Sequence, residues 1–124
     1  MSGLAIQKLL AGALSRADVD AFMSAHRFPL VEGPSVTFAF RGDVEGVNLR
    51  HWIYGLESSQ PLTRAGDTDL FYGIVELPPE SRVEYKLELF KQGKSWWVED
   101  PLNPNRARDP FGANSVAHGE GYEI

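Results

Sequence analysis

The stretch that decides the fold is Arg82-Val83-Glu84-Tyr85-Lys86-Leu87-Glu88-Leu89, in which charged and apolar residues alternate without a break. Successive side chains of a β-strand point to opposite faces of the sheet, so one face of this strand is apolar and the other is charged. Such a strand packs one face on a core and exposes the other to water. The stretch therefore predicts an antiparallel sheet with one buried face.

Strand patterns recur on both sides of this stretch. They are short, they are not separated by helices, and turn residues divide them, which is typical of an antiparallel β-sandwich. The segment Asp100 to Pro110 carries three prolines and two asparagines, so we expect a loop there rather than a paired strand. The predicted strands are residues 36–40, 47–53, 70–77, 83–89, 95–98 and 115–117.

The N-terminal segment has helical periodicity instead. Apolar residues from Leu4 to Leu14 largely follow i, i+3, i+4 spacing, and Ser15 stands three residues before Asp18, as in a capping box. We expect two short helices, or one helix broken near Ser15, that end around His26. Helices of this length are not stable alone in water, so their apolar faces must cover the domain's own sheet or meet a partner.

Composition excludes several classes of protein. The chain has 124 residues, 43% of them apolar, no cysteine, and a formal net charge of −5. It is too apolar for a disordered chain, and no apolar run approaches the ~18 residues of a membrane helix. The negative charge argues against nucleic-acid binding, and disulfides and Cys-based metal sites are impossible. No secretory signal is evident, so we expect a cytoplasmic protein that binds neither membrane nor nucleic acid.

The sequence carries no motif for catalysis or for a cofactor. It lacks a G-x-S-x-G nucleophile turn, a P-loop and a dinucleotide-binding fingerprint, and its three histidines have no metal-ligand spacing. Asp67 and Asp69 lack the further oxygen ligands that calcium requires, so the favoured interpretation is a hairpin turn whose carboxylates bond local backbone amides. We therefore expect no catalytic residue, no metal and no cofactor in this chain.

Two neighbouring tryptophans are the most informative aromatic pair. In a strand Trp96 and Trp97 point to opposite faces, and Trp96 shares parity with the apolar Val98. We expect Trp96 in the core and Trp97 on the surface, where its indole either stacks on a sugar ring or packs under the proline-rich segment or against a neighbouring domain. Asp100 and Asn103 either bond local amides or form part of a stiff recognition edge.

Six motifs lie in a characteristic order between Phe28 and Ile124, namely Val36–Gly42, Pro61–Arg64, Gly66–Phe71, Val83–Leu87, Asp100–Pro104 and Phe111–Val116. Together they resemble the N-terminal domain of enterochelin (ferric siderophore) esterase-like proteins. This resemblance implies an immunoglobulin-like, early-set β-sandwich (28–124) after a helical extension (1–27). It also implies a following α/β-hydrolase domain that holds the catalytic residues.

The sandwich is also similar to glycogen-binding modules. Trp97 stands at the spacing before Asp100-Pro101 at which those modules place a sugar-stacking tryptophan, and Lys86 matches the lysine of their Y-K-F motif. Their second tryptophan has no counterpart here, because residues 57–60 are Glu-Ser-Ser-Gln and Trp52 comes several residues too early. The candidate binding residues are Trp97, Lys86, Asp100, Asn103 and Asn114.

Three functions follow as hypotheses. The first is a non-catalytic accessory domain that positions or covers the active site of a hydrolase, with the helices, a sheet edge and residues 100–110 in contact with it. The second is an oligosaccharide-binding module, specifically for α-glucan, that uses Trp97 and Lys86. The third is a stand-alone regulatory or scaffold module. The N-terminal helices could also dimerise the protein, since their apolar stripe needs a partner.

Overall fold

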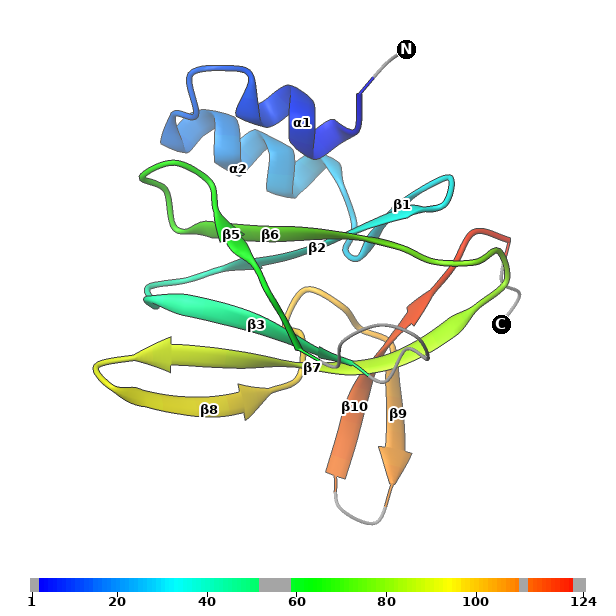
Figure 1. Cartoon of the computed structure of the whole chain (residues 1–124). Coiled ribbons are helices and arrows are strands. Elements are labelled where there is room, and N and C mark those ends of the chain that lie inside the picture. Colours follow the sequence, from blue (N-terminus) through cyan, green and yellow to red (C-terminus); the bar gives the residue numbers. More distant parts are fainter. Residues whose placement is uncertain (1–2, 52–58, 110–111, 122–124) are drawn as a thin grey trace.

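The alternating stretch around Tyr85 forms the central strand of the larger of two antiparallel sheets (Figure 1). The computed structural model describes residues 3–51, 59–109 and 112–121. One edge of the central strand, β7, pairs with β3 along most of its length, and the other edge pairs first with β10 and then with β8. The strands of this sheet are β4 (Ser59–Pro61), β3 (Gly46–His51), β7 (Arg82–Lys91), β8 (Lys94–Val98), β10 (Gly112–His118) and β9 (Arg106–Asp109).

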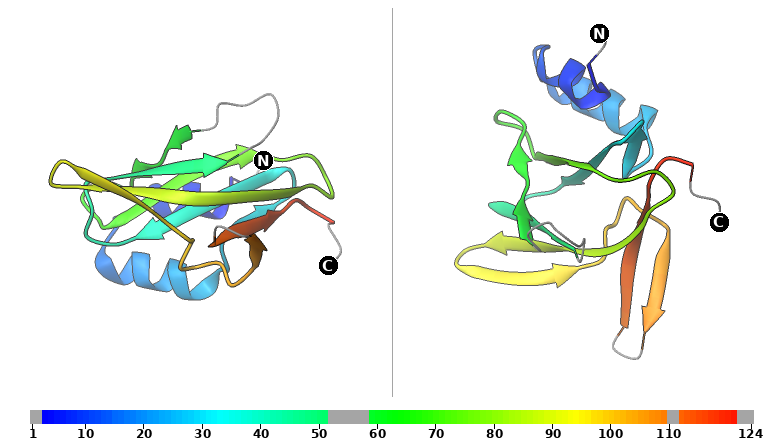
Figure 2. Two further views of the ribbon diagram at one scale, coloured as in Figure 1. Left: turned by 90° about the horizontal axis from the view of Figure 1, so that it is seen from below. Right: turned by 45° about the vertical axis from the view of Figure 1, so that its right-hand side comes forward.

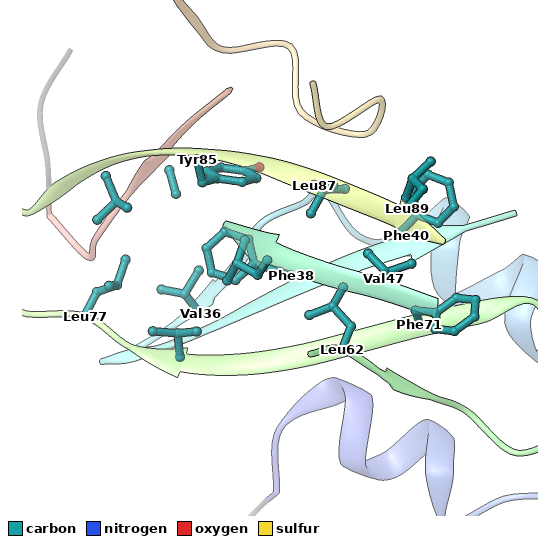
Figure 3. Close-up of a cluster of buried hydrophobic side chains, with 14 of the residues drawn as sticks. Val36, Phe38, Phe40, Val47, Leu62, Phe71, Leu77, Tyr85, Leu87 and Leu89 are labelled. Carbon is teal, nitrogen blue, oxygen red and sulfur yellow. The ribbon is translucent and has the colours of Figure 1, made fainter. Parts of the chain in front are cut away.

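A smaller four-stranded sheet faces it, and the main core lies between the two sheets (Figure 3). Phe38 from β2 meets Tyr85 from β7 edge to face, with ring centroids 4.9 Å apart. The apolar faces of both strands therefore point into the same core, as the alternating pattern predicts. In sheet order the strands are β1 (Leu30–Glu32), β2 (Ser35–Arg41), β6 (Leu70–Glu76) and β5 (Thr63–Arg64).

Two helices, α1 (Ala5–Leu10) and α2 (Arg16–Ala25), cover the outer face of the four-stranded sheet (Figures 1 and 2). The predicted capping box is present, because the Asp18 amide donates to Ser15 Oγ at 3.0 Å and the Ser15 amide donates to Asp18 Oδ2 at 3.1 Å. The helices therefore cover the domain's own sheet, which was one of the two alternatives. Neither helix in the described ranges has the length and hydropathy needed to cross a bilayer.

This second core leaves strand β2 buried on both of its faces. Thr37 and Ala39 point away from the main core, yet both are almost fully buried. The half-buried strand expected over 36–40 is thus a fully buried one, because the helices replace water on its outer face. The argument for a dimer through the helices also loses its basis, since their apolar stripe is already covered. The second core consists of Ile6, Val19, Phe22, Phe28, Ala39, Ala65 and Leu70.

The loop expected over 100–110 is partly wrong. Arg106–Asp109 forms β9, which pairs antiparallel with β10, and β10 itself is longer than the expected 115–117. No apolar alternation marks β9, because its pairing comes from backbone groups along the edge of β10. Strands β1, β4 and β5 were not expected, since two or three residues are too few to show a period. Residues 52 and 53 of the predicted second strand lie outside the described residues.

The burial of Ile6 in the helical layer predicts a large effect on stability. Replacing Ile6, which is fully buried, with Ala should lower the free energy of unfolding by about 2–5 kcal/mol, since it leaves a cavity against the sheet. Urea denaturation measures this loss. Lys8→Ala, an exposed change in the same helix, should have little effect. Equal stability of the Ile6 and Lys8 variants would show that the helices do not dock as described.

Candidate binding face

Trp97 lies on the outer face of the larger sheet, where it meets charged side chains from two other strands. It stands opposite Glu88 of β7 and 48% of its surface is exposed. The guanidinium of Arg50, from β3, lies over the indole with its carbon 5.1 Å from the ring centroid, a cation–π contact. The expectation that Trp97 is a surface residue is therefore confirmed, and the ring is held in place by its neighbour.

Arg50 is itself fixed by an ion pair with Glu88. Its Nη2 lies 2.5 Å and its Nε 2.7 Å from Glu88 Oε1. Burial alone would raise the pKa of Glu88, but hydrogen bonds and charge from Arg50, with further hydrogen bonds from Asn48 and Ser95, outweigh it and lower this pKa. Glu88 was expected to face water but is largely covered, because Arg50 and Trp97 pack across it.

Lys86 and Asn114 lie on this same outer face. Lys86 stands opposite Arg50 in the β3–β7 pairing, and Asn114 Nδ2 donates to Glu84 Oε1 at 3.0 Å. The bond from Asn114, followed by that from Arg82, lowers the pKa of Glu84. Three of the five candidate binding residues thus share one surface of one sheet. We call this surface, formed by Asn48, Arg50, Lys86, Glu88, Trp97 and Asn114, the outer face.

The other two candidates, Asp100 and Asn103, lie in the interior. Both are almost fully buried, and their side chains converge on the Tyr85 hydroxyl. The hydroxyl donates to Asp100 Oδ2 at 2.6 Å and accepts from Asn103 Nδ2 at 3.0 Å. Asp100 Oδ1 also accepts the Leu102 amide. The local-amide interpretation of these residues therefore fits the structure, and in this conformation a surface ligand cannot reach them.

Sequence analysis did not identify three residues that belong to this network, namely Ser115, Arg106 and Glu99. Ser115 Oγ accepts the Asp100 amide at 2.7 Å, and Arg106 donates to the carbonyls of Asp100 and Asn103 while its Nε pairs with Glu99. Burial, above all, raises the pKa of both Asp100 and Tyr85. No local sequence pattern predicts such a network, because its members come from β7, β9, β10 and the segment between β8 and β9.

The expected burial of Trp96 is wrong. Its parity is correct, since it stands opposite the buried Leu89, but 42% of its surface is exposed. Strand β8 pairs with β7 alone and is outermost at its end of the sheet (Figure 1). Trp96 therefore lies at the margin of the main core, whereas Val98, on the same face of β8, packs against that core. The parity of a strand predicts the face of a residue, but not whether another layer covers it. Trp52 lies outside the described residues.

The hairpin interpretation of Asp67 and Asp69 is confirmed for the turn itself, which joins β5 to β6, but within the described residues neither carboxylate bonds a local amide. Thr68 closes the turn, because its hydroxyl donates to the Ala65 carbonyl at 2.7 Å and accepts the Leu70 amide at 3.1 Å. Asp69 pairs with Arg41 instead of a local amide. Within the described ranges, no group of three or more His, Asp or Glu residues could hold a metal ion.

Comparison with known proteins yields a structural likeness only. No protein-family model matches the sequence, and no curated protein matches it. Three solved structures of the enterobactin esterase Fes from Shigella flexneri match with TM-scores of 0.56–0.57 and 17–18% identity. They were solved in the presence of enterobactin, 2,3-dihydroxy-N-benzoyl-serine or 2,3-dihydroxy-N-benzoyl-glycine. The match covers 73% of this chain but only 30–31% of the esterase chains, so this chain has the fold of one part of a Fes-like esterase.

The buried hydroxyl of Tyr85 should contribute strongly to stability. Tyr85→Phe removes the donor to Asp100 Oδ2 and leaves the Leu102 amide as the remaining donor to this buried carboxylate, so it should lower the free energy of unfolding by about 1–3 kcal/mol. Tyr72→Phe is the matched control, because no hydrogen bond of the Tyr72 hydroxyl is found in the described part of the chain. Urea unfolding of both variants measures the difference. A loss no greater than that of the control would contradict the assigned network.

Proposed function

We propose that this chain is a non-catalytic accessory domain of an esterase, which precedes an α/β-hydrolase domain and positions or covers its active site. The observation that carries the proposal is the likeness of 73% of this chain to 30–31% of the Fes chains. The sandwich is, in this proposal, of the immunoglobulin-like, early-set type, and the protein works in the cytoplasm.

The surroundings of the Ser115 hydroxyl support a non-catalytic role. Ser115 is fully buried, and its Oγ is occupied by the amide of Asp100. A serine nucleophile must instead be reachable by substrate and hydrogen-bonded to a base. Tyr85, Asp100 and Asn103 are likewise bonded to one another inside the fold. The polar groups of this cluster therefore hold the structure together and do not present a reactive atom.

The contact with the hydrolase, in this proposal, involves the segment between β8 and β9. Asp100 and Arg106 hold this segment at both ends, while Pro101 and Pro104 within it are exposed. The exposed Trp96 lies close by in sequence and offers a large apolar side chain for burial in an interface. The helices contribute less than expected, because their apolar faces are already packed on the four-stranded sheet.

Deletion within the parent enzyme tests the accessory role. The isolated chain should not hydrolyse p-nitrophenyl acetate above the buffer rate. The parent enzyme without residues 1–124 should retain turnover of this small ester but lose turnover of a bulky ester, because the accessory domain orients only large substrates. Ester hydrolysis by the isolated chain that Ser115→Ala abolishes would overturn the proposal, as would a truncated parent that is unimpaired on both esters.

A second candidate function is oligosaccharide binding by the outer face. The observation that favours it is the common location of Trp97, Lys86 and Asn114 beside Arg50. An exposed indole flanked by hydrogen-bonding groups suits a sugar ring, which offers C–H groups to the ring face and hydroxyls to its neighbours. Because Arg50 covers one face of the indole, the sugar would stack on the other.

The two tryptophans provide a matched pair for testing this candidate. Maltoheptaose at millimolar concentration should change tryptophan fluorescence in the wild type and in Trp96→Ala, but not in Trp97→Ala. Trp96 is the control because it lies on the opposite face of the same strand. A wild-type signal that does not respond to the sugar, or one that survives in Trp97→Ala, would exclude this function.

A further inference from the structure

A cavity of about 550 Å³ opens between the α1–α2 connection and the β5–β6 turn. Its volume lies within the roughly 300–1,000 Å³ of sites that hold small organic molecules. Ala13, Leu14 and Val19 supply the apolar part of its lining from the helical side. The cavity is remote from the outer face, because it belongs to the helical layer on the other sheet.

Charged side chains of both signs complete the lining. Arg41 and Asp69 are already engaged with each other at 2.9 Å, and Arg41 also pairs with Asp20 at 2.6 Å. Arg16 and Asp67 line the same cavity, and neither forms an ion pair or a side-chain hydrogen bond within the described residues. The cavity therefore presents one cation and one carboxylate that are available to a ligand, together with an apolar surface.

The backbone on both sides of the cavity adopts the left-handed conformation. Leu14 has φ +55° and Gly66 has φ +54°, and a Cβ at Gly66 would lie 3.2 Å from Leu14 Cδ1. A left-handed leucine is uncommon, since glycine or asparagine takes this conformation with less strain. Strained residues of this kind concentrate at ligand sites. Here the strain directs an apolar side chain toward the turn that carries Asp67.

We propose that this cavity binds a short peptide with free termini, with its carboxylate on Arg16, its ammonium on Asp67 and an apolar side chain against Ala13 and Leu14. The argument is charge complementarity. A simple anion would meet the carboxylates of Asp67 and Asp69, and a simple cation would meet Arg16. A zwitterion satisfies both free groups at once, and the volume exceeds what a single amino acid requires.

Titration of the isotopically labelled chain with leucyl-leucine tests the proposal. Saturable shifts should appear in the amide resonances of Leu14 and Gly66 at millimolar peptide. The doubly blocked N-acetyl-leucyl-leucinamide, which has lost both charges, should bind about tenfold or more weakly, because charge-assisted hydrogen bonds carry the affinity. Equal binding of the blocked peptide, or the absence of saturable shifts with leucyl-leucine, would overturn the proposal.

Substitutions separate the two charged contacts. Arg16→Gln and Asp67→Asn should each weaken leucyl-leucine binding about tenfold, and each should lower the selectivity over the peptide that lacks the corresponding charge. Lys94→Gln, an exposed change in β8, is the control and should leave binding unchanged. Both lining residues are exposed, so the variants should fold normally. Wild-type affinity in both variants would show that the peptide does not use this cavity.

Discussion

The hydrogen bond between the Tyr85 hydroxyl and the Asp100 carboxylate, 2.6 Å long and buried, is the interaction on which the rest of the sandwich depends. The ring of Tyr85 packs on Phe38 in the main core. Its hydroxyl is therefore a buried polar group that needs hydrogen-bond partners inside the fold. Desolvating a carboxylate is unfavourable, and the raised pKa of Asp100 expresses this. The carboxylate is tolerated because Tyr85 and the Leu102 amide both donate to it. One side chain thereby joins the core to the segment that leads from β8 to β9.

The two faces of β8 carry surfaces of opposite character. On the outer face Arg50 and Glu88 order Trp97 through short charge-assisted contacts, so that face is polar and pre-organised. On the other face of the same strand, Trp96 has neither a charged neighbour among its described contacts nor a covering layer. A preordered polar surface suits a small ligand, whereas an uncovered indole at the margin of a core suits burial by another protein surface. The two proposed functions thus use different faces of β8 and do not exclude each other.

The sequence predicted the parts of this architecture in which side-chain periodicity and burial coincide. The alternation in β7 and the Ser15–Asp18 capping box both reflect local physics, and both are present. Three features that local spacing did not predict share a different cause. Trp96 has core parity but lacks a covering layer, β9 pairs through its backbone without an apolar pattern, and Asp100 and Asn103 are polar residues buried by partners distant in sequence. Each depends on what another segment places nearby, and such information is absent from local spacing.

The helical layer limits where a neighbouring domain could bind. Because Ile6, Val19 and Phe22 are buried against the four-stranded sheet, the apolar stripe of the helices is not available to a partner. Apolar surface for the proposed interface must come from elsewhere, and among the described residues the large exposed apolar side chains are Val31, Ile74, Trp96 and Trp97. The two tryptophans are adjacent, and they precede the segment that the Tyr85–Asp100 bond holds rigid. A rigid surface loses little conformational entropy on association, so the same bond that stabilises the fold also supports β8 and the segment after it as the proposed interface.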